Sequence, residues 1–163
     1  MRLTLVRLAS IVGIGGSLLA VAVPAFVTAL SASRQTEALV GLDRIAAGAV
    51  AGAELHSQKE SFPPSVELTP AEVPRGTRLV DPPEAWEHLT WRSLGFRAEG
   101  AHAYAFQFES SVDPMTGLAR FAATAHGDLD GDGSLSTFQI QGERKPGEPA
   151  KVVTGLLVSR ELE

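Results

Sequence analysis

Three aspartates at alternate positions form the strongest candidate site in this sequence. Asp128, Asp130 and Asp132 belong to the run Asp-Leu-Asp-Gly-Asp-Gly-Ser, which matches the opening of a calcium-binding loop. Carboxylates at this spacing can converge on one hard cation, and the glycine in the sixth position of the loop permits the sharp turn between them. Ser134 would add its backbone carbonyl, and Ser136 would add a hydroxyl or a bridging water. The sequence therefore predicts a Ca²⁺ site in this loop.

The rest of the loop differs from a complete EF-hand. Its twelfth position is Gln139, where an EF-hand has a bidentate Glu, and the loop lies between predicted strands and not between helices. A complete EF-hand is therefore rejected. The open alternative is a metal-free hairpin turn, because Asp-Gly pairs are favoured in such turns on backbone grounds alone. Three like charges at alternate positions repel one another unless they are solvated or neutralised, which favours the cation.

The remaining chemistry-bearing residues do not combine into a catalytic motif. There is no cysteine, which excludes a disulfide scaffold, a thiolate zinc site and a cysteine nucleophile. The histidines are too scattered for a zinc motif and are expected to be isolated and exposed; they are His56, His88, His102 and His126. The serines considered as nucleophiles lack a GxSxG context; they are Ser65, Ser93 and Ser110. We therefore expect a protein that is not an enzyme and has no small-molecule substrate.

The charge of the chain is distributed unevenly between its two ends. The 163 residues include 14 Lys and Arg against 19 Asp and Glu, for a net charge of −5. Residues 1–34 hold three of the arginines and no acid, which leaves 11 basic against 19 acidic side chains in the rest of the chain. An acidic body has the wrong sign for nucleic-acid phosphates, so no nucleic-acid partner is expected.

The first 33 residues are predicted to form a membrane helix. Residues 8–33 carry no charge, and a helix of that length reaches roughly 39 Å, enough for a hydrocarbon core of about 30 Å. Arg2 and Arg7 precede the apolar run, so the N-terminus is expected in the cytoplasm. The predicted location is the inner membrane, crossed once, with the body in the periplasm.

Two other interpretations of this segment stay open. A cleaved signal peptide could end near Ala29-Leu30-Ser31, although the apolar run is longer than the usual h-region of about 7–15 residues. A buried core helix is the second alternative, but a chain of 17.2 kDa has little protein with which to cover it. Pro24 lies inside the run and should kink the helix, because proline removes a helix donor.

An amphipathic helix is expected to continue over residues 34–55. Apolar residues recur there at spacings of three and four, while charged residues fall on other faces. The apolar stripe consists of Leu39, Leu42, Ile45, Ala46, Ala49 and Ala53. Gly41, Gly48 and Gly52 weaken the helix slightly but permit close approach of a neighbouring backbone.

Residues 56–163 are predicted to form a soluble loop and sheet domain. The prolines of residues 60–83 predict an extended loop, and residues 85–96 are expected to form a helical turn in which Trp86 and Trp91 supply core aromatics. Alternation of apolar and polar residues predicts four strands. These strands are residues 103–109, 118–126, 135–141 and 151–159. Short connections make them a four-stranded antiparallel meander covered by the amphipathic helix, so the predicted fold class is α+β.

This order of elements resembles that of type IV pilins and type II secretion pseudopilins. The chain has Leu-Thr-Leu-Val-Arg-Leu at residues 3–8, where the family shows Phe-Thr-Leu-Ile-Glu-Leu, and Pro24 falls at the family's distance into the helix. The likeness extends through Trp86, Ser-Leu-Gly-Phe at residues 93–96 and Gly-Asp-Leu-Asp-Gly-Asp-Gly at residues 127–133. It implies a long N-terminal helix, transmembrane and then amphipathic, packed on the sheet. It also implies that the partners are other pilin or pseudopilin subunits, contacted through that helix in the inner membrane or in a cell-surface filament.

Two N-terminal residues depart from the family pattern. Arg2 stands where the family has the glycine before its processing site, and Arg7 stands where it has a glutamate in the membrane helix. In the family that carboxylate neutralises the terminal amine of a neighbouring subunit, whereas an arginine would repel the amine. We therefore expect an unprocessed chain and a minor or accessory subunit. The alternative is a membrane-anchored periplasmic calcium-binding module that does not polymerise.

Overall fold

The computed structural model describes residues 35–159 of the chain, and their side chains as far as residue 153. The predicted membrane helix, residues 1–33, lies outside the described residues. None of the helices within the described range combines the length and the apolar character needed to cross a bilayer.

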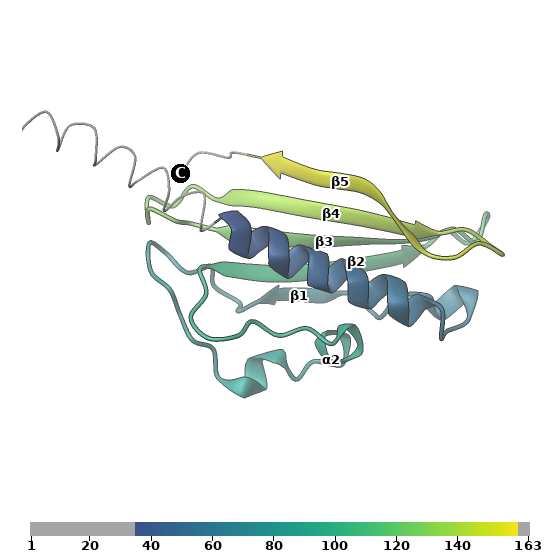
Figure 1. The fold of residues 1–163 in the computed structure, drawn as a ribbon, viewed down its shortest axis with the longest axis horizontal. Coiled ribbons are helices and arrows are strands. Elements are labelled where there is room, and N and C mark those ends of the chain that lie inside the picture. The colour runs from purple at the N-terminus through teal and green to yellow at the C-terminus, as the bar shows by residue number, and fades with distance from the viewer. Residues whose placement is uncertain (1–34, 160–163) are drawn as a thin grey trace, which may run out of the picture. The chain divides into compact units, whose positions relative to one another are not determined.

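The described chain is an α+β fold built on one antiparallel sheet (Figure 1). A helix occupies residues 35–53, and short 3-10 helices occupy Gln58–Glu60 and Pro83–Trp86. The other elements are β1 (Val66–Thr69), α2 (Leu89–Leu94), β2 (Tyr104–Val112), β3 (Ala119–Gly127), β4 (Ser136–Arg144) and β5 (Lys151–Ser159). The strands lie side by side in chain order and each is antiparallel to its neighbours. Strands β2 to β5 form the meander that their short connections predict.

The sheet has five strands, so the prediction of four is wrong. The additional strand is β1, which lies in the proline-rich segment that the sequence predicted as a loop. It pairs with β2 through Val66 opposite Phe108 and Thr69 opposite Phe106. A short strand at the edge of a sheet tolerates flanking prolines because its outer amides need no ladder partner. Its alternation extends over only four residues, which is too short to stand out in the sequence.

The helix over residues 35–53 packs on one face of the sheet, and its predicted apolar stripe faces the core. The buried members are Ala38, Leu42, Ile45, Ala46, Ala49 and Ala53, while Leu39 is partly buried. Glu37 fixes the first described turn of the helix, since its Oε1 accepts a hydrogen bond from the Ala103 N–H at 2.7 Å. At the other end, Arg144 Nη1 donates to the carbonyl oxygens of Ala53, at 2.6 Å, and His56, at 3.0 Å. The Ala53 carbonyl belongs to the last helical residue and also accepts from the His56 N–H at 3.4 Å, so Arg144 holds together the helix end and the turn that follows it.

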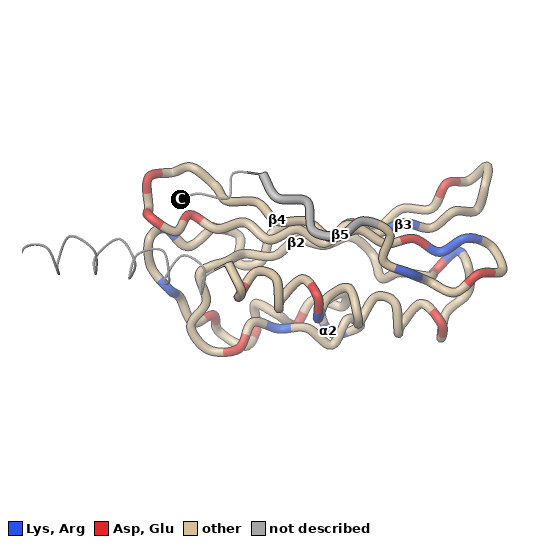
Figure 2. Tube along the Cα trace, turned by 45° about the horizontal axis from the view of Figure 1, so that its top comes forward, with Lys and Arg blue, Asp and Glu red and all other residues tan. Residues whose placement is uncertain are grey.

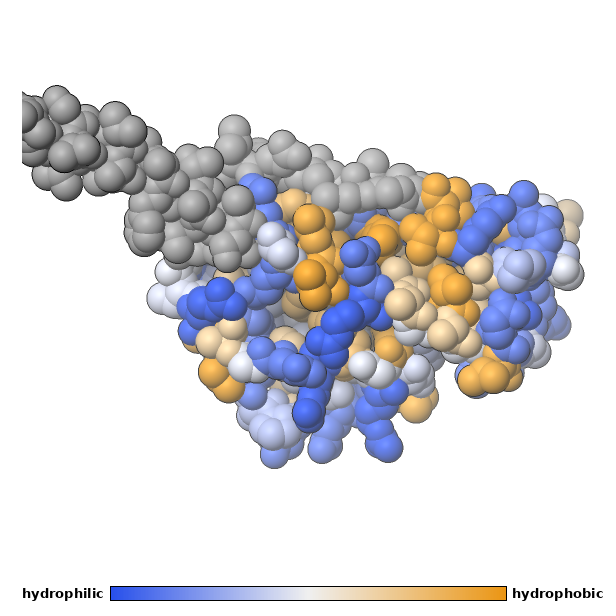
Figure 3. Space-filling model, in the orientation of Figure 1, coloured by the Kyte–Doolittle hydropathy of each residue, from blue (hydrophilic) through white to orange (hydrophobic). Residues whose placement is uncertain are grey.

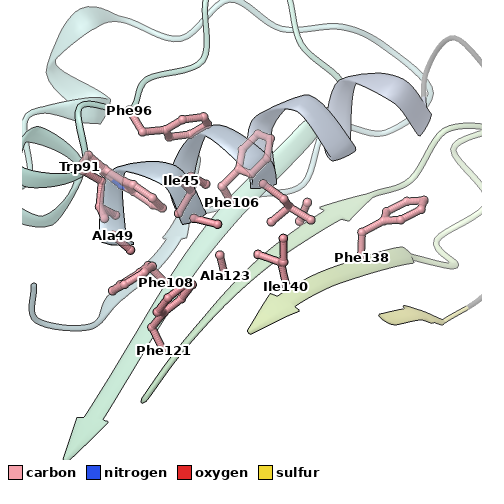
Figure 4. Packing of buried hydrophobic residues seen from close by; sticks show 14 of the residues in the cluster. Ile45, Ala49, Trp91, Phe96, Phe106, Phe108, Phe121, Ala123, Phe138 and Ile140 are labelled. Carbon is pink, nitrogen blue, oxygen red and sulfur yellow. The ribbon is translucent and has the colours of Figure 1, made fainter. Parts of the chain in front are cut away.

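The helix packs over a part of the sheet where the middle strand, β3, carries small side chains. Ala123 is paired with Phe108 on one side and Ile140 on the other, and the next inward row places Ala125 between Phe106 and Phe138. In these two rows small residues on β3 face large residues on its neighbours, as Figure 4 shows around Ala123 beneath Ile45 and Ala49 of the helix. At Phe121 the order is reversed, since this large residue of β3 lies between Ser110 and Gly142. Alanine and glycine on the helix complete this fit because they let the two backbones approach closely.

Helix α2 holds an aromatic cluster against the edge of this core. His88 caps the helix through its ring, which accepts from the Thr90 N–H at 3.3 Å, and Gly95 ends it with a left-handed φ of 62°. Trp91 is fully buried, and its ring centroid lies 5.4 Å from that of Trp86 and 5.6 Å from that of Phe96. The expectation that the tryptophans are core residues is confirmed.

Candidate metal site

The three aspartates lie in the loop that joins β3 to β4. One carboxylate oxygen from each of Asp128, Asp130 and Asp132 lies within 4.8 Å of the others, so the structure brings the predicted ligands together. Figure 2 shows the acidic positions of this loop in red, at the end of the sheet where β3 stops and β4 starts. This end is fixed by the pairing of Gly127 with Ser136.

Asp128 builds the loop as well as facing its interior. It is 1% exposed, and its Oδ1 accepts from the Gly131 N–H at 2.7 Å while its Oδ2 accepts from the Gly133 N–H at 3.1 Å. Its main-chain oxygen accepts a third hydrogen bond, from the Gly76 N–H at 2.7 Å. Leu129 next to it is buried in the core. Asp128 is therefore held in place whether or not a cation binds.

Asp130 and Asp132 are exposed, and each of their carboxylates accepts fewer hydrogen bonds than that of Asp128. Asp130 Oδ1 accepts from the Asp132 N–H at 3.1 Å, and Asp132 Oδ1 accepts from the Ser134 N–H at 2.6 Å. An ionised carboxylate offers about four lone-pair positions, so each of these groups keeps acceptor capacity for a cation. Gly131 and Gly133 make the path of the loop feasible, because their φ values of 83° and 91° are costly for other residues.

The two predicted serine ligands differ in their surroundings. Ser134 is half-buried in the loop, next to the Asp132 carboxylate that its own N–H contacts. Ser136 is the first residue of β4 and is 1% exposed. It shares the inward face of β4 with Phe138 and Ile140, and its hydroxyl has no hydrogen-bond partner among the described residues. Participation of either serine in metal binding stays a prediction.

Two of the histidines are not the exposed, isolated residues that the sequence led us to expect. His102 is 3% exposed, and both of its ring nitrogens contact acceptor oxygens. His126 is half-buried on the opposite face of the sheet from the helix, where its Nδ1 lies 3.0 Å from Thr137 Oγ1. The spacing of His102 gave a usable signal, since it is two residues before Tyr104 and continues the inward-facing series of Phe106 and Phe108.

The environment of His126 predicts a loss of stability in acid. Burial lowers the pKa of His126 from its ordinary value of 6.5, because a charged imidazole is poorly solvated there. As the pH falls below 6.5, the unfolded chain binds the proton more readily than the folded chain, so the free energy of unfolding decreases. We expect His126→Gln to reduce the dependence of the free energy of unfolding on pH, measured by urea unfolding between about pH 5 and pH 7.5. An unchanged slope in the variant would contradict the assignment.

The chemistry available in the loop is cation binding by hard oxygen donors. Three carboxylates could hold a metal ion, and oxygen-only donor sets suit hard divalent cations better than zinc or copper. The acidic cluster is a grouping of neighbouring residues in the loop between β3 and β4, and its Asp128 main chain is also held by the Gly76 N–H. Searches of protein-family models, of curated proteins and of solved structures found no match to this chain.

Proposed function

We propose that this chain is a non-enzymatic, pilin-like structural subunit of a type IV pilus or type II secretion pseudopilus. A minor or accessory role fits better than that of the major subunit. The N-terminal segment would hold the chain in the inner membrane before assembly and would then pack against the same segment of neighbouring subunits. The acidic body would face outward.

The observation that carries the proposal is the order of the helix and the sheet. An uncharged run at residues 8–33 leads directly into the helix of residues 35–53, which packs on one face of a single antiparallel meander. This order resembles the pilin family's arrangement. The apolar stripe of the helix packs against its own sheet and contributes to one core.

The outer side of the helix also supports packing against other subunits. Val40 is 52% exposed, and Ala47 and Ala51 are exposed further along the helix. Figure 3 views the molecule from the helix side and shows hydrophobic patches separated by hydrophilic ones. Small and apolar exposed residues allow close contact with another helix without the burial of unpaired charge.

The proposed minor role rests on the charge of Arg7. An arginine at this position repels a neighbouring terminal amine in the apolar core of a filament, where charge repulsion is least screened. A subunit with this charge is suited to a position in a filament that has few like neighbours.

Deletion of the chain tests whether it serves one of these machines. We expect the deletion strain to lose surface piliation or to secrete less of the substrates of the type II system, and complementation in trans should restore the lost property. If piliation and secretion are both unchanged, the proposal fails.

We also propose that the loop of Asp128, Asp130 and Asp132 binds Ca²⁺. The three carboxylates supply hard oxygen ligands around one point, and Ca²⁺ accepts irregular geometry. They fall short of the six to eight ligands that Ca²⁺ takes, and no bidentate glutamate follows, so the affinity should lie near about 10⁻⁴–10⁻³ M. Such an affinity suits a cation present at high concentration outside the cytoplasm.

Titration of the full chain in detergent with Ca²⁺ tests this second proposal. We expect measurable heat in isothermal titration calorimetry, and we expect the double variant Asp130→Asn and Asp132→Asn to abolish it. Asp43→Asn is the matched control, because Asp43 is an exposed acid on the helix far along the chain from the loop. No heat at millimolar Ca²⁺ would contradict the proposal.

A substitution at Asp128 distinguishes an effect on the structure of the loop from an effect on metal binding. Asp128→Asn removes one of two carboxylate acceptors for backbone N–H groups, so it should destabilise the metal-free chain by about 1–2 kcal/mol. The double variant at the two exposed aspartates should leave the metal-free stability within about 0.5 kcal/mol. Urea unfolding in excess chelator measures both.

A membrane-anchored periplasmic calcium-binding module that does not polymerise is the second candidate function. The acidic cluster favours it, since a cation site needs no filament. The two functions differ in where the protein is found, because an anchored module stays with the membrane and a filament subunit leaves with sheared filaments.

A further inference from the structure

A small cavity lies between the helix over residues 35–53 and the segment that joins α2 to β2. Its volume is about 150 Å³, which is room for several water molecules and therefore for a phosphate group. Three arginines from three different segments line it, namely Arg44 of the helix, Arg78 of the connection between β1 and α2, and Arg97 of the segment before β2. We call this space the arginine cavity.

Arg78 is the fixed member of the three. Its Nη2 lies 2.6 Å from Glu37 Oε2, and its Nε and Nη2 both donate to the carbonyl oxygen of Ala101, at 3.0 and 2.7 Å. These contacts join the start of the helix to the segment before β2. Arg78 therefore holds a positive charge at the cavity, but most of its donors are already in use.

Arg44 and Arg97 are the members that can respond to a ligand. Arg44 Nη2 lies 3.5 Å from Glu99 Oε1, and the two side chains are 45% and 67% exposed, so this ion pair is weak. The Arg44 guanidinium lies 5.7 Å from the centre of the Phe96 ring, which holds it beside the cavity. Arg97 is exposed and forms no ion pair with a described residue.

The charge around the cavity runs against the charge of the body. Its lining has three arginines and two glutamates, whereas the chain after residue 34 has 11 basic and 19 acidic side chains. Part of its wall is apolar, since Phe96 and Phe106 are 5% and 2% exposed, and an apolar wall strengthens the attraction of a charge in the cavity. Guanidinium groups match the oxygens of phosphate with paired hydrogen bonds. The cavity therefore suits a phosphate group.

The cavity also lies close along the chain to the predicted membrane segment. Glu37, the first residue that lines it, comes four residues after Ser33, the last of the uncharged run. Four residues span at most about 14 Å even when fully extended. The headgroup region extends roughly 5–8 Å beyond each side of the hydrocarbon core. With residues 8–33 in the membrane, the helix side of the cavity is therefore within reach of lipid phosphates, whatever path the chain takes between them.

We propose that the arginine cavity binds the phosphate of a membrane phospholipid and so holds the body against the surface of the bilayer. Arg44 and Arg97 donate hydrogen bonds to the phosphate oxygens, and Arg78 adds a fixed positive charge. Val40, which also lines the cavity and is 52% exposed, offers an apolar contact to the glycerol and acyl part of the lipid. The inference rests on the membrane anchoring in the proposed function, and it adds a lipid partner for the body itself.

Nuclear magnetic resonance of the full chain in micelles of an uncharged detergent tests the site. With arginine labelled with ¹⁵N, we expect the Nε–Hε signals of Arg44 and Arg97 to shift saturably as phosphatidylglycerol is added to the micelles. Diacylglycerol with the same acyl chains is the control ligand, because it lacks the phosphate, and it should leave both signals in place. Equal shifts with the two lipids, or no shift with phosphatidylglycerol, would overturn the proposal.

The double variant Arg44→Gln and Arg97→Gln provides the second arm, followed through the ³¹P signal of the lipid. Both side chains are exposed, so the fold should be kept, and each substitution should weaken binding about tenfold. Arg92→Gln with Arg120→Gln is the matched control, because these exposed arginines carry the same charge and lie outside the cavity lining. Equal weakening in the two double variants would show general attraction between charges and would overturn the proposal.

Inorganic phosphate distinguishes a lipid site from a site for the free ion. The membrane segment keeps the lipid headgroups near the cavity at high effective concentration, so inorganic phosphate should need about a tenfold or higher concentration to give the same shifts. An equal response to inorganic phosphate and to phosphatidylglycerol would overturn the assignment to a lipid.

Alkaline carbonate extraction of cell membranes tests the anchoring separately. We expect the chain to stay in the membrane pellet, and its release would overturn the anchoring on which the proposal rests. A chain that stays in the pellet but gives no phospholipid shift would refute the lipid site alone and leave the filament role standing.

Discussion

Replacing Trp91 with alanine is expected to destabilise the body by about 3–5 kcal/mol, a large part of the roughly 5–15 kcal/mol typical of a folded domain. The side chain is fully buried, and its ring packs against two other aromatic rings. Its Nε1–H also donates to Thr69 Oγ1 at 3.0 Å, which ties α2 to the edge strand β1. The variant therefore loses apolar contacts, gains a cavity and loosens two elements together.

Urea unfolding followed by far-ultraviolet circular dichroism measures this loss without depending on tryptophan fluorescence. Leu89→Ala is the matched control, because Leu89 begins the same helix but is 64% exposed, so its loss should cost less than about 0.5 kcal/mol. A loss below about 1 kcal/mol for Trp91→Ala would show that the aromatic cluster is not packed as described.

Replacing Gly48 with alanine is expected to destabilise the body by about 1–3 kcal/mol, although alanine favours a helix. A methyl group on Gly48 would overlap the carbonyl oxygen of Leu94 and lie 2.9 Å from the carbonyl carbon. These are backbone atoms at the end of α2, so neither a rotamer change nor a small tilt removes the clash. The helix and α2 would have to move apart.

Gly52 lies in the next turn of the same helix and provides a control, because alanine there is expected to stabilise the body and not to destabilise it. A methyl group there meets no atom within 4 Å, so Gly52→Ala should stabilise the body by about 0.5–1 kcal/mol through helix propensity alone. The same urea experiment compares the two variants. Equal effects at both positions would contradict the close contact of Gly48 with Leu94.

The strands and the buried side of the helix could be predicted because they follow simple periods. Alternation in β2 placed Tyr104, Phe106 and Phe108 on one face, and all three are buried. The spacing of three and four placed Leu42 and Ile45 inside. These patterns are local consequences of backbone geometry, so no knowledge of the partner surface was needed.

The edge strand β1 and the connection between β1 and α2, residues 70–88, could not be predicted, because they depend on tertiary contacts. β1 forms a strand because it pairs with the edge of the sheet at β2. Its four residues are too few to show a recognisable alternation of apolar and polar side chains. The contact of Asp81 with His102 joins residues 21 apart along an irregular segment that no period describes. Gly48 was recognised as a place of close approach, but the sequence could not show that Leu94 is the neighbour.

The candidate metal site was more predictable than the rest of the body, because its carboxylates are neighbours along one loop. Their spacing implied convergence, and the structure places one oxygen of each within 4.8 Å of the others. The sequence did not reveal that Asp128 is buried and that both of its carboxylate oxygens accept hydrogen bonds from backbone N–H groups. That difference separates the residue that shapes the loop from the two exposed residues best placed to respond to a cation.

Shear fractionation of the producing cells tests the proposed filament role most directly. Cells are sheared, the released filaments are pelleted, and the chain is detected with antibody in that pellet and in the membrane fraction. A pilin-like subunit should be recovered in the filament pellet at low stoichiometry together with the other subunits, with a reserve in the membrane. Recovery of all of the chain in the membrane fraction, from cells that release filaments normally, would contradict the proposal and favour the anchored calcium-binding module.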